Sequence, residues 1–206
     1  MTEEPTADDL GKRRDRTYTY LRLWGIETDL TILPIARAPL RSPGTHAVCG
    51  RAAASAVVAL KGQGLSLAEV FAFADAYDVW GHLTADEHDF VLDNEVSAER
   101  LLQFAWKFEQ SFVFEWALGL VVHLRFPDAS VDTGRVMEQL MTRVLTVSAD
   151  ERPPVRSTKE LADAADVAFA LQAIAAASGS TPPLGLARSV VEERAVAFEW
   201  LLTPQD

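Results

Sequence analysis

Helix-start signals recur along this chain of 206 residues. Before three of the expected helices a serine or threonine stands three positions ahead of a glutamate, and Ser97 before the segment AERLL gives a weaker fourth signal. At this spacing the hydroxyl and the carboxylate satisfy backbone amides that have no partner at the start of an α-helix. The sequence therefore favours an all-α fold. The three pairs are Ser66 with Glu69, Thr84 with Glu87, and Ser157 with Glu160.

Apolar residues recur at helical spacing between segments rich in proline and glycine, which sets the expected organisation. We expect a single-domain multi-helix bundle over residues 1–206, with about seven to eight helices and little or no strand. The only strand-like alternation, at 28–37, contains Pro34, which is unsuited to an inner strand. Residues 1–9 are expected to be disordered, and 25–44 to form a long irregular connection. The expected helices span 7–24, 46–61, 67–77, 85–93, 98–123, 131–147, 158–177 and 186–202.

The charge balance narrows the classes of partner. The formal net charge is −11, and the basic residues are scattered along the chain. We therefore expect no nucleic-acid partner, because a binding surface for phosphates needs clustered positive charge.

The longest apolar stretch, 104–122, carries three charged residues, too many for a membrane span. The single cysteine, Cys49, excludes an internal disulfide, and no apolar leader opens the chain, so we expect a cytoplasmic protein without a membrane partner.

The segment FAWKFEQSFVFEWALG, 104–119, combines aromatic and charged residues within the helix expected at 98–123. We expect this helix to be central, with the helices at 158–177 and 186–202 packed against it. With successive residues 100° apart, Glu109 falls on the apolar face that includes Trp106 and Trp116. The other two charged residues fall on faces that can reach water, and they are Lys107 and Glu115.

Other charged residues also occupy apolar faces. Asp163 and Asp166 lie in a helix that is apolar all round, and Glu193 and Arg194 lie within or beside the apolar stripe of the last helix. Buried carboxylates must find partners or become neutral. We infer a polar network in the core, with the individual pairs left open. Its expected acids are Glu109, Glu193, Asp163 and Asp166, and its expected bases are Arg194 and Arg156.

Two interpretations of this network stay open. In the first, the charges orient the helices, and removing one partner alone would cost about 3–5 kcal/mol. In the second, some of the charges line a pocket, where shifted pKa values would serve catalysis or ligand binding. We favour the first, because no nucleophile accompanies these residues.

The chain resembles a bacterial family catalogued as domain of unknown function 4272 (DUF4272). Three segments carry the resemblance: FAWKFEQSFVFEWALGLV, RSTKELADAADVAFAL and GLARSVVEERAVAFEWLL. It implies no activity, because the family has none established. The chain departs from the family pattern at Ala170, Gln172, Ala173 and Ala195, where the family has Arg, His and Trp residues and a further His. If the family's catalysis uses those histidines, this member is expected to lack it. The resemblance places these residues on family motif positions: Trp106, Glu109, Trp116, Arg156, Asp163, Asp166 and Arg194.

The remaining chemistry-bearing residues indicate no catalytic centre. No glutamate and histidine stand at the spacing of a helical metal site, and no phosphate-binding loop is present, so we expect no metal and no cofactor. Cys49 follows His46 by three residues in an alanine-rich helix, which is more typical of a packed thiol than of a nucleophile. Phe114 and Leu118, on the polar side of their helix, are expected to be exposed.

The leading hypothesis is a non-catalytic cytosolic interaction or regulatory protein whose acidic surface suits a basic protein partner, with a homodimer left open. The alternative is an enzyme or a binder of small anions. Its internal pocket would be lined by Glu109, Arg156, Asp163, Asp166 and Arg194.

Overall fold

The computed structural model describes residues 7–28, 43–179 and 182–203. These residues form an all-α structure without a strand, as predicted. Shorter helical turns are η2 (Trp80–His82), η3 (Met141–Leu145), η4 (Ala149–Glu151) and η5 (Pro183–Gly185). The α-helices are α1 (Ala7–Leu23), α2 (Thr45–Gly62), α3 (Leu67–Ala76), α4 (Ala85–Leu92), α5 (Ala98–Ala105), α6 (Phe108–Ala117), α7 (Thr133–Leu140), α8 (Thr158–Ala177) and α9 (Arg188–Leu202).

The predicted capping signals are confirmed. At the starts of α3, α4 and α8 the hydroxyl accepts a hydrogen bond from the third backbone amide of the helix, and the glutamate accepts one from the capping residue's own amide. Ser97 likewise accepts from the amide of Arg100 at 3.2 Å at the start of α5. These local contacts explain why the helix starts could be located from the sequence.

The expected single helix at 98–123 is wrong, because the chain forms α5 and α6 with a turn between them. Gly62 of α2 lies against the backbone of Ala105 near the end of α5. Further back along α2, the carbonyl of Ala52 accepts a hydrogen bond from Ser111 of α6 at 3.1 Å. A straight helix could not follow α2 at both places, so the segment bends. Gly119, with φ 72°, then stops the helix well before residue 123.

Other expected boundaries also change. Ala7–Asp9 belong to α1, so the expected disorder does not extend to residue 9. The helix expected at 131–147 is α7 followed by the π-helical turn η3. The strand-like alternation at 28–37 and most of the connection at 25–44 lie outside the described residues.

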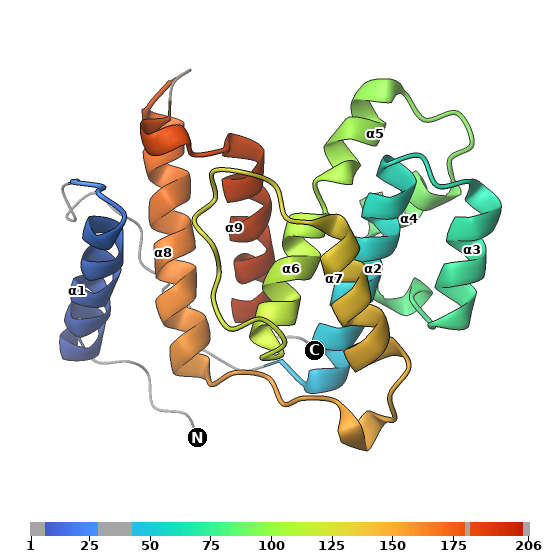
Figure 1. Ribbon diagram of the computed structural model, residues 1–206, viewed down its shortest axis with the longest axis horizontal. Helices are drawn as coiled ribbons and strands as arrows, with labels where there is room; N and C mark the ends of the chain where they lie inside the picture. The colour runs from blue at the N-terminus through green and yellow to red at the C-terminus, as the bar shows by residue number, and fades with distance from the viewer. Residues whose placement is uncertain (1–6, 29–42, 180–181, 204–206) are drawn as a thin grey trace. The chain divides into compact units, whose positions relative to one another are not determined.

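The chain divides into two compact units, and the first comprises Met1–Pro43, Arg125–Ser130 and Arg156–Asp206. Within it α8 lies between α1 and α9 (Figure 1). Trp24 packs against Phe126 with ring centroids 5.3 Å apart. The buried apolar cluster of this unit contains Leu21, Ile26, Ala170, Leu171, Ala175, Leu186 and Val191.

The second unit comprises Gly44–Leu124 and Val131–Val155. Its central element is α2, which contacts each of α3 to α7. This helix is rich in alanine and buried over most of its length, so neighbouring helices approach its backbone closely. On one side Phe90 of α4 stacks on Phe104 of α5, with ring centroids 4.0 Å apart.

Burial of α6 corrects three expectations about exposure. All ten residues of this helix are buried, Phe114 and Glu115 among them, and so is Leu118 just after it. Lys107 is also partly covered. The predicted polar side of the helix does not exist, because a wheel assigns faces to one helix but cannot show that neighbours cover all of them.

Candidate functional site

Two of the predicted inward acids form ion pairs with α1 in the first unit. Arg16 donates to both carboxylate oxygens of Asp163, at 2.6 and 2.9 Å, and Lys159 donates to the same carboxylate at 2.9 Å. Arg13 and Asp166, both buried, form a pair with N···O 2.5 Å. Burial would raise the pKa of Asp163, but the bonds from Arg16 and Lys159 outweigh it and lower that pKa.

Arg13 and Arg16 are not among the site residues predicted from the sequence. A signal for them was present, because these two arginines stand three residues apart in a predicted helix, as Asp163 and Asp166 do in theirs. Two pairs with the same spacing can meet along two facing helices. The scattered arginines of the chain gave no reason to select these two.

The other predicted site residues have different surroundings. Arg194 is buried and donates to the carbonyl of Arg125 at 2.6 Å. Arg156 pairs with Glu160 at 3.1 Å, one turn along the surface of α8. Glu193 is half-buried. The pairing of Arg194 with one of the interior acids stays a prediction.

In the second unit, Glu109 is buried and accepts a hydrogen bond from the backbone amide of Val131 at 2.7 Å. Trp116 is buried and Trp106 half-buried, as their position on the apolar face predicts. Glu109 therefore anchors the chain just before α7 through at least one of its oxygens.

A buried ion pair that the sequence did not reveal joins α2 to α4. Arg51 donates to the two carboxylate oxygens of Glu87 at 2.7 and 3.1 Å, and to the carbonyl of His82 at 2.5 Å. Lys107 approaches the same carboxylate at 3.7 Å. Burial would raise the pKa of Glu87, but the hydrogen bonds and charge of Arg51 outweigh it and lower that pKa. Glu87 thus has two tasks, since its carboxylate also accepts from the amide of Thr84.

A second buried cation of α2 holds the other end of α4. Lys61 donates to the carbonyls of Phe90, Val91 and Asp93 at 2.6, 2.9 and 2.6 Å. These carbonyls are among those left without helical partners where a helix ends. Burial lowers the pKa of Lys61. Together Arg51 and Lys61 fix α4 on α2 from within.

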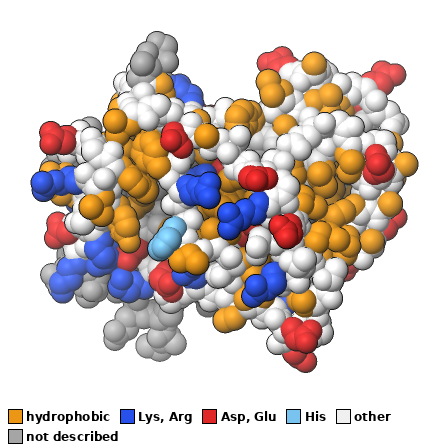
Figure 2. All heavy atoms as spheres, viewed as in Figure 1, with side chains coloured by type: hydrophobic (Ala, Val, Ile, Leu, Met, Phe, Trp, Pro, Cys, Tyr) orange, Lys and Arg blue, Asp and Glu red, His pale blue; other side chains and the backbone are white. Residues whose placement is uncertain are grey.

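The outer side of the same region is strongly acidic. Residues 62–99 contain nine acidic residues and no lysine or arginine. All of them except Glu87 are exposed or half-buried, and we call these eight the acidic face. Figure 2 shows acidic and apolar side chains over α3 and α4 without a basic one among them. The acidic face consists of Glu69, Asp75, Asp78, Asp86, Asp89, Asp93, Glu95 and Glu99.

Aromatic and apolar side chains lie among these acids. Trp80 contacts the rings of Phe71 and His88, with centroids 5.4 and 6.0 Å away, and donates to Asp75 at 2.6 Å. Leu92 at the end of α4 is 44% exposed. The region therefore offers apolar contact area as well as charge, as protein interfaces do.

The geometry gives little support to a cysteine nucleophile, a metal site or a membrane-spanning helix. Cys49 is buried, and burial raises the pKa of its thiol, which disfavours the nucleophilic thiolate. Within the described ranges, no three His, Cys, Asp or Glu side chains converge as metal ligands would. None of the helices in the described part of the chain is long and apolar enough to cross a bilayer.

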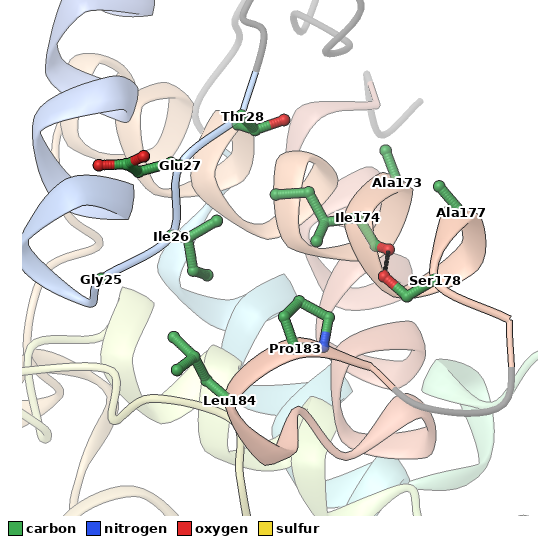
Figure 3. A pocket seen from close by; sticks show the side chains of 10 residues that line it. All are labelled: Gly25, Ile26, Glu27, Thr28, Ala173, Ile174, Ala177, Ser178, Pro183 and Leu184. Atoms are coloured by element: carbon green, nitrogen blue, oxygen red, sulfur yellow. Dashed lines mark hydrogen bonds between the residues drawn. The ribbon is translucent and has the colours of Figure 1, made fainter.

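The first unit contains an apolar pocket of about 460 Å³ (Figure 3). Its walls come from the turn after α1, the last turns of α8, and η5. None of the charged residues predicted to line an internal pocket is among its described lining residues. These are Gly25, Ile26, Glu27, Thr28, Ala173, Ile174, Ala177, Ser178, Pro183 and Leu184.

The fold and these sites define an all-α protein with paired interior charges, an acidic face and an apolar pocket. Residues 13–206 match the family model described as "Domain of unknown function (DUF4272)", and the chain belongs to this family. No curated protein and no solved structure matches the chain.

Proposed function

We propose that this chain is a non-catalytic cytosolic interaction or regulatory protein whose acidic face binds a basic protein partner. The observation that carries the proposal is the concentration of surface acids over residues 62–99 without a single lysine or arginine. Arg100 pairs with Asp86 beside this segment, but the surface keeps an excess of negative charge, which steers a partner of opposite charge and rejects partners of like charge.

The construction beneath the acidic face supports the same proposal. Arg51 and Lys61 hold α4 from the inside, so its exposed acids project from a fixed helix. A rigid presentation reduces the entropy that is lost when a partner binds. Leu92 and the ring of Trp80 supply apolar contacts between the charges.

Two interior acids that a catalytic site could use, Asp163 and Asp166, form ion pairs with basic side chains. Asp163 has Arg16 and Lys159 as partners, and Asp166 has Arg13. These pairs favour the interpretation in which the interior charges orient helices. A stoichiometric metal ion or nucleotide in the purified protein would contradict a non-catalytic role.

Charge-neutralised variants test the proposal. Asp89→Asn, Glu95→Gln and Glu99→Gln together remove three charges from the acidic face, at side chains that are exposed. The matched control removes three exposed acids outside it: Asp128→Asn, Glu138→Gln and Glu192→Gln. The full chain is used to capture proteins from cell extract at low and high salt, with quantitative mass spectrometry.

The expected result is a set of basic proteins that the control variant retains and the acidic-face variant loses, with retention falling as salt rises. Equal capture by the two variants would contradict the proposal, because generic attraction to a protein of net charge −11 would not distinguish them.

A further inference from the structure

The pocket of the first unit is lined by apolar groups that face one another. In Figure 3 the side chains of Ile26, Ile174, Pro183 and Leu184 surround a common space, while Glu27 points away from it toward α1. Ser178, at the rim, donates its hydroxyl to the carbonyl of Ile174 at 2.5 Å. The described walls are therefore mostly hydrocarbon, with hydroxyl groups from Thr28 and Ser178, and Glu27, the charged residue among them, does not point into the space.

Leu184, at the mouth of the pocket, has a strained backbone. Its φ of 55° and ψ of 22° lie in the left-handed region, which is costly for a branched side chain. Burial does not compensate for this cost, because Leu184 is 56% exposed. Strain of this kind persists where the surrounding structure enforces it, and it occurs often at ligand clamps.

The contacts that hold η5 in place are well defined. The amide of Leu186 donates to the carbonyl of Pro183 at 3.1 Å, and the amide of Ala187 donates to the carbonyl of Pro127 at 2.8 Å. Arg188 donates to the carbonyls of Ala175, at 2.9 Å, and Gly179 near the end of α8. The guanidinium of Arg188 is thus bound to the end of α8, and these contacts hold the segment in which Leu184 lines the pocket.

We propose that this pocket binds a small, uncharged, apolar molecule, which buries the exposed side chain of Leu184 against Ile26 and Ile174. The volume of about 460 Å³ falls within the range of small-molecule sites. An anionic ligand would lose hydration without gaining a positively charged partner among the described walls, and Glu27 points away from a cation in the space. This site is independent of the acidic face, and its ligand differs from the anion expected for an internal pocket.

The test uses N-phenyl-1-naphthylamine, an uncharged fluorescent probe, titrated against the full chain. We expect saturable binding to one site, with at least tenfold weaker binding of 8-anilinonaphthalene-1-sulfonate, which carries a charge. Ala177→Phe should fill part of the pocket and lower the affinity for the uncharged probe at least tenfold, because Ala177 lines the pocket. Ala176→Phe is the matched control: Ala176 is also exposed on α8 but does not line the pocket, so its variant should bind as wild type does.

The variant Leu184→Gly distinguishes a loss of contact with the ligand from a loss of folding. Glycine relieves the left-handed strain, so thermal stability should be maintained or increased, while the affinity for the uncharged probe falls several-fold. Absent or unsaturable binding would overturn the proposal, and so would equal responses of the Ala176 and Ala177 variants. Probe affinity that falls as protein concentration rises would also overturn it, by assigning the pocket to a second copy of the chain.

Discussion

Arg51 and Glu87 form a two-point ion pair, with N···O distances of 2.7 and 3.1 Å, in which both side chains are almost completely buried. Desolvation of two charges is costly, and two further hydrogen bonds, from Arg51 to the carbonyl of His82 and from the amide of Thr84 to Glu87, offset part of that cost. The pair fixes the start of α4, the helix that carries Asp86 and Asp89 of the acidic face.

Removing one member of this pair should destabilise the protein strongly. We expect Arg51→Met to lower the free energy of unfolding by about 3–5 kcal/mol, because Glu87 is left charged and buried. The double variant Arg51→Met with Glu87→Leu should lose less than the sum of the single losses. Asp86→Asn, at an exposed pair, should cost less than about 1 kcal/mol. Chemical denaturation of wild type, these three variants and Glu87→Leu alone measures these values, and strict additivity would contradict the coupling.

The same pair predicts a loss of stability in acid. The pKa of Glu87 is lowered in the folded protein from its ordinary value of 4.5, so the unfolded chain binds its proton first as the pH falls. The contribution of the pair is complete at neutral pH and is lost as the pH falls below 4.5. In Glu87→Gln this part of the pH dependence should be absent when unfolding is followed from pH 7 to 3.

Lys61 should be indispensable for the end of α4. Lys61→Met keeps most of the apolar stem but leaves the carbonyls of Phe90, Val91 and Asp93 without their donor. We expect a loss of about 1–3 kcal/mol, with faster amide hydrogen exchange in α4. Lys159→Met, at a lysine that is mostly exposed, is the control and should change stability by less than about 1 kcal/mol. Similar losses in both variants would contradict the capping role.

Glu115 should reduce stability at neutral and alkaline pH. It is 1% exposed, and among the described residues no group donates to its Oε1 atom. Burial raises its pKa to about 9. The folded protein therefore keeps a proton that the unfolded chain releases, and stability falls as the pH rises from 4.5 to about 9.

Glu115→Gln removes this titration. We expect the variant to match wild type near pH 5 and to be more stable by a few kcal/mol near pH 8, measured by thermal and chemical unfolding at both values. If the difference in stability between Glu115→Gln and wild type is the same at both pH values, the carboxyl of Glu115 is ionised in the folded protein, which would contradict the prediction.

Gly62 should tolerate no side chain, because a Cβ there would lie 2.4 Å from the amide nitrogen of Ala105. Gly62→Ala is expected to cost about 1–3 kcal/mol by forcing α2 and α5 apart. Gly11→Ala, in α1, is the control, because a Cβ there meets nothing within 4 Å. That variant should be stabilised by about 0.5–1 kcal/mol through its helix propensity. A stabilised Gly62→Ala would contradict the close approach.

Local chemistry was sufficient to predict where four of the helices start. The starts of α3, α4, α5 and α8 depend on side chains within four residues of the helix start, so the sequence alone located them. Membership of the DUF4272 family was likewise predicted from three quoted segments and confirmed by the match over residues 13–206. The burial of Glu109 followed from its place among aromatic residues at helical spacing.

Tertiary structure decided what a single helix cannot encode. Arg13 and Arg16 meet Asp166 and Asp163 across about 150 residues of chain, a pairing that depends on how α1 packs on α8. The bend between α5 and α6 follows from the close approach of both helices to α2, and the burial of Glu115 follows from neighbours on every side of α6. Periodicity assigns faces to a helix, whereas only packing decides which faces meet protein and which meet water.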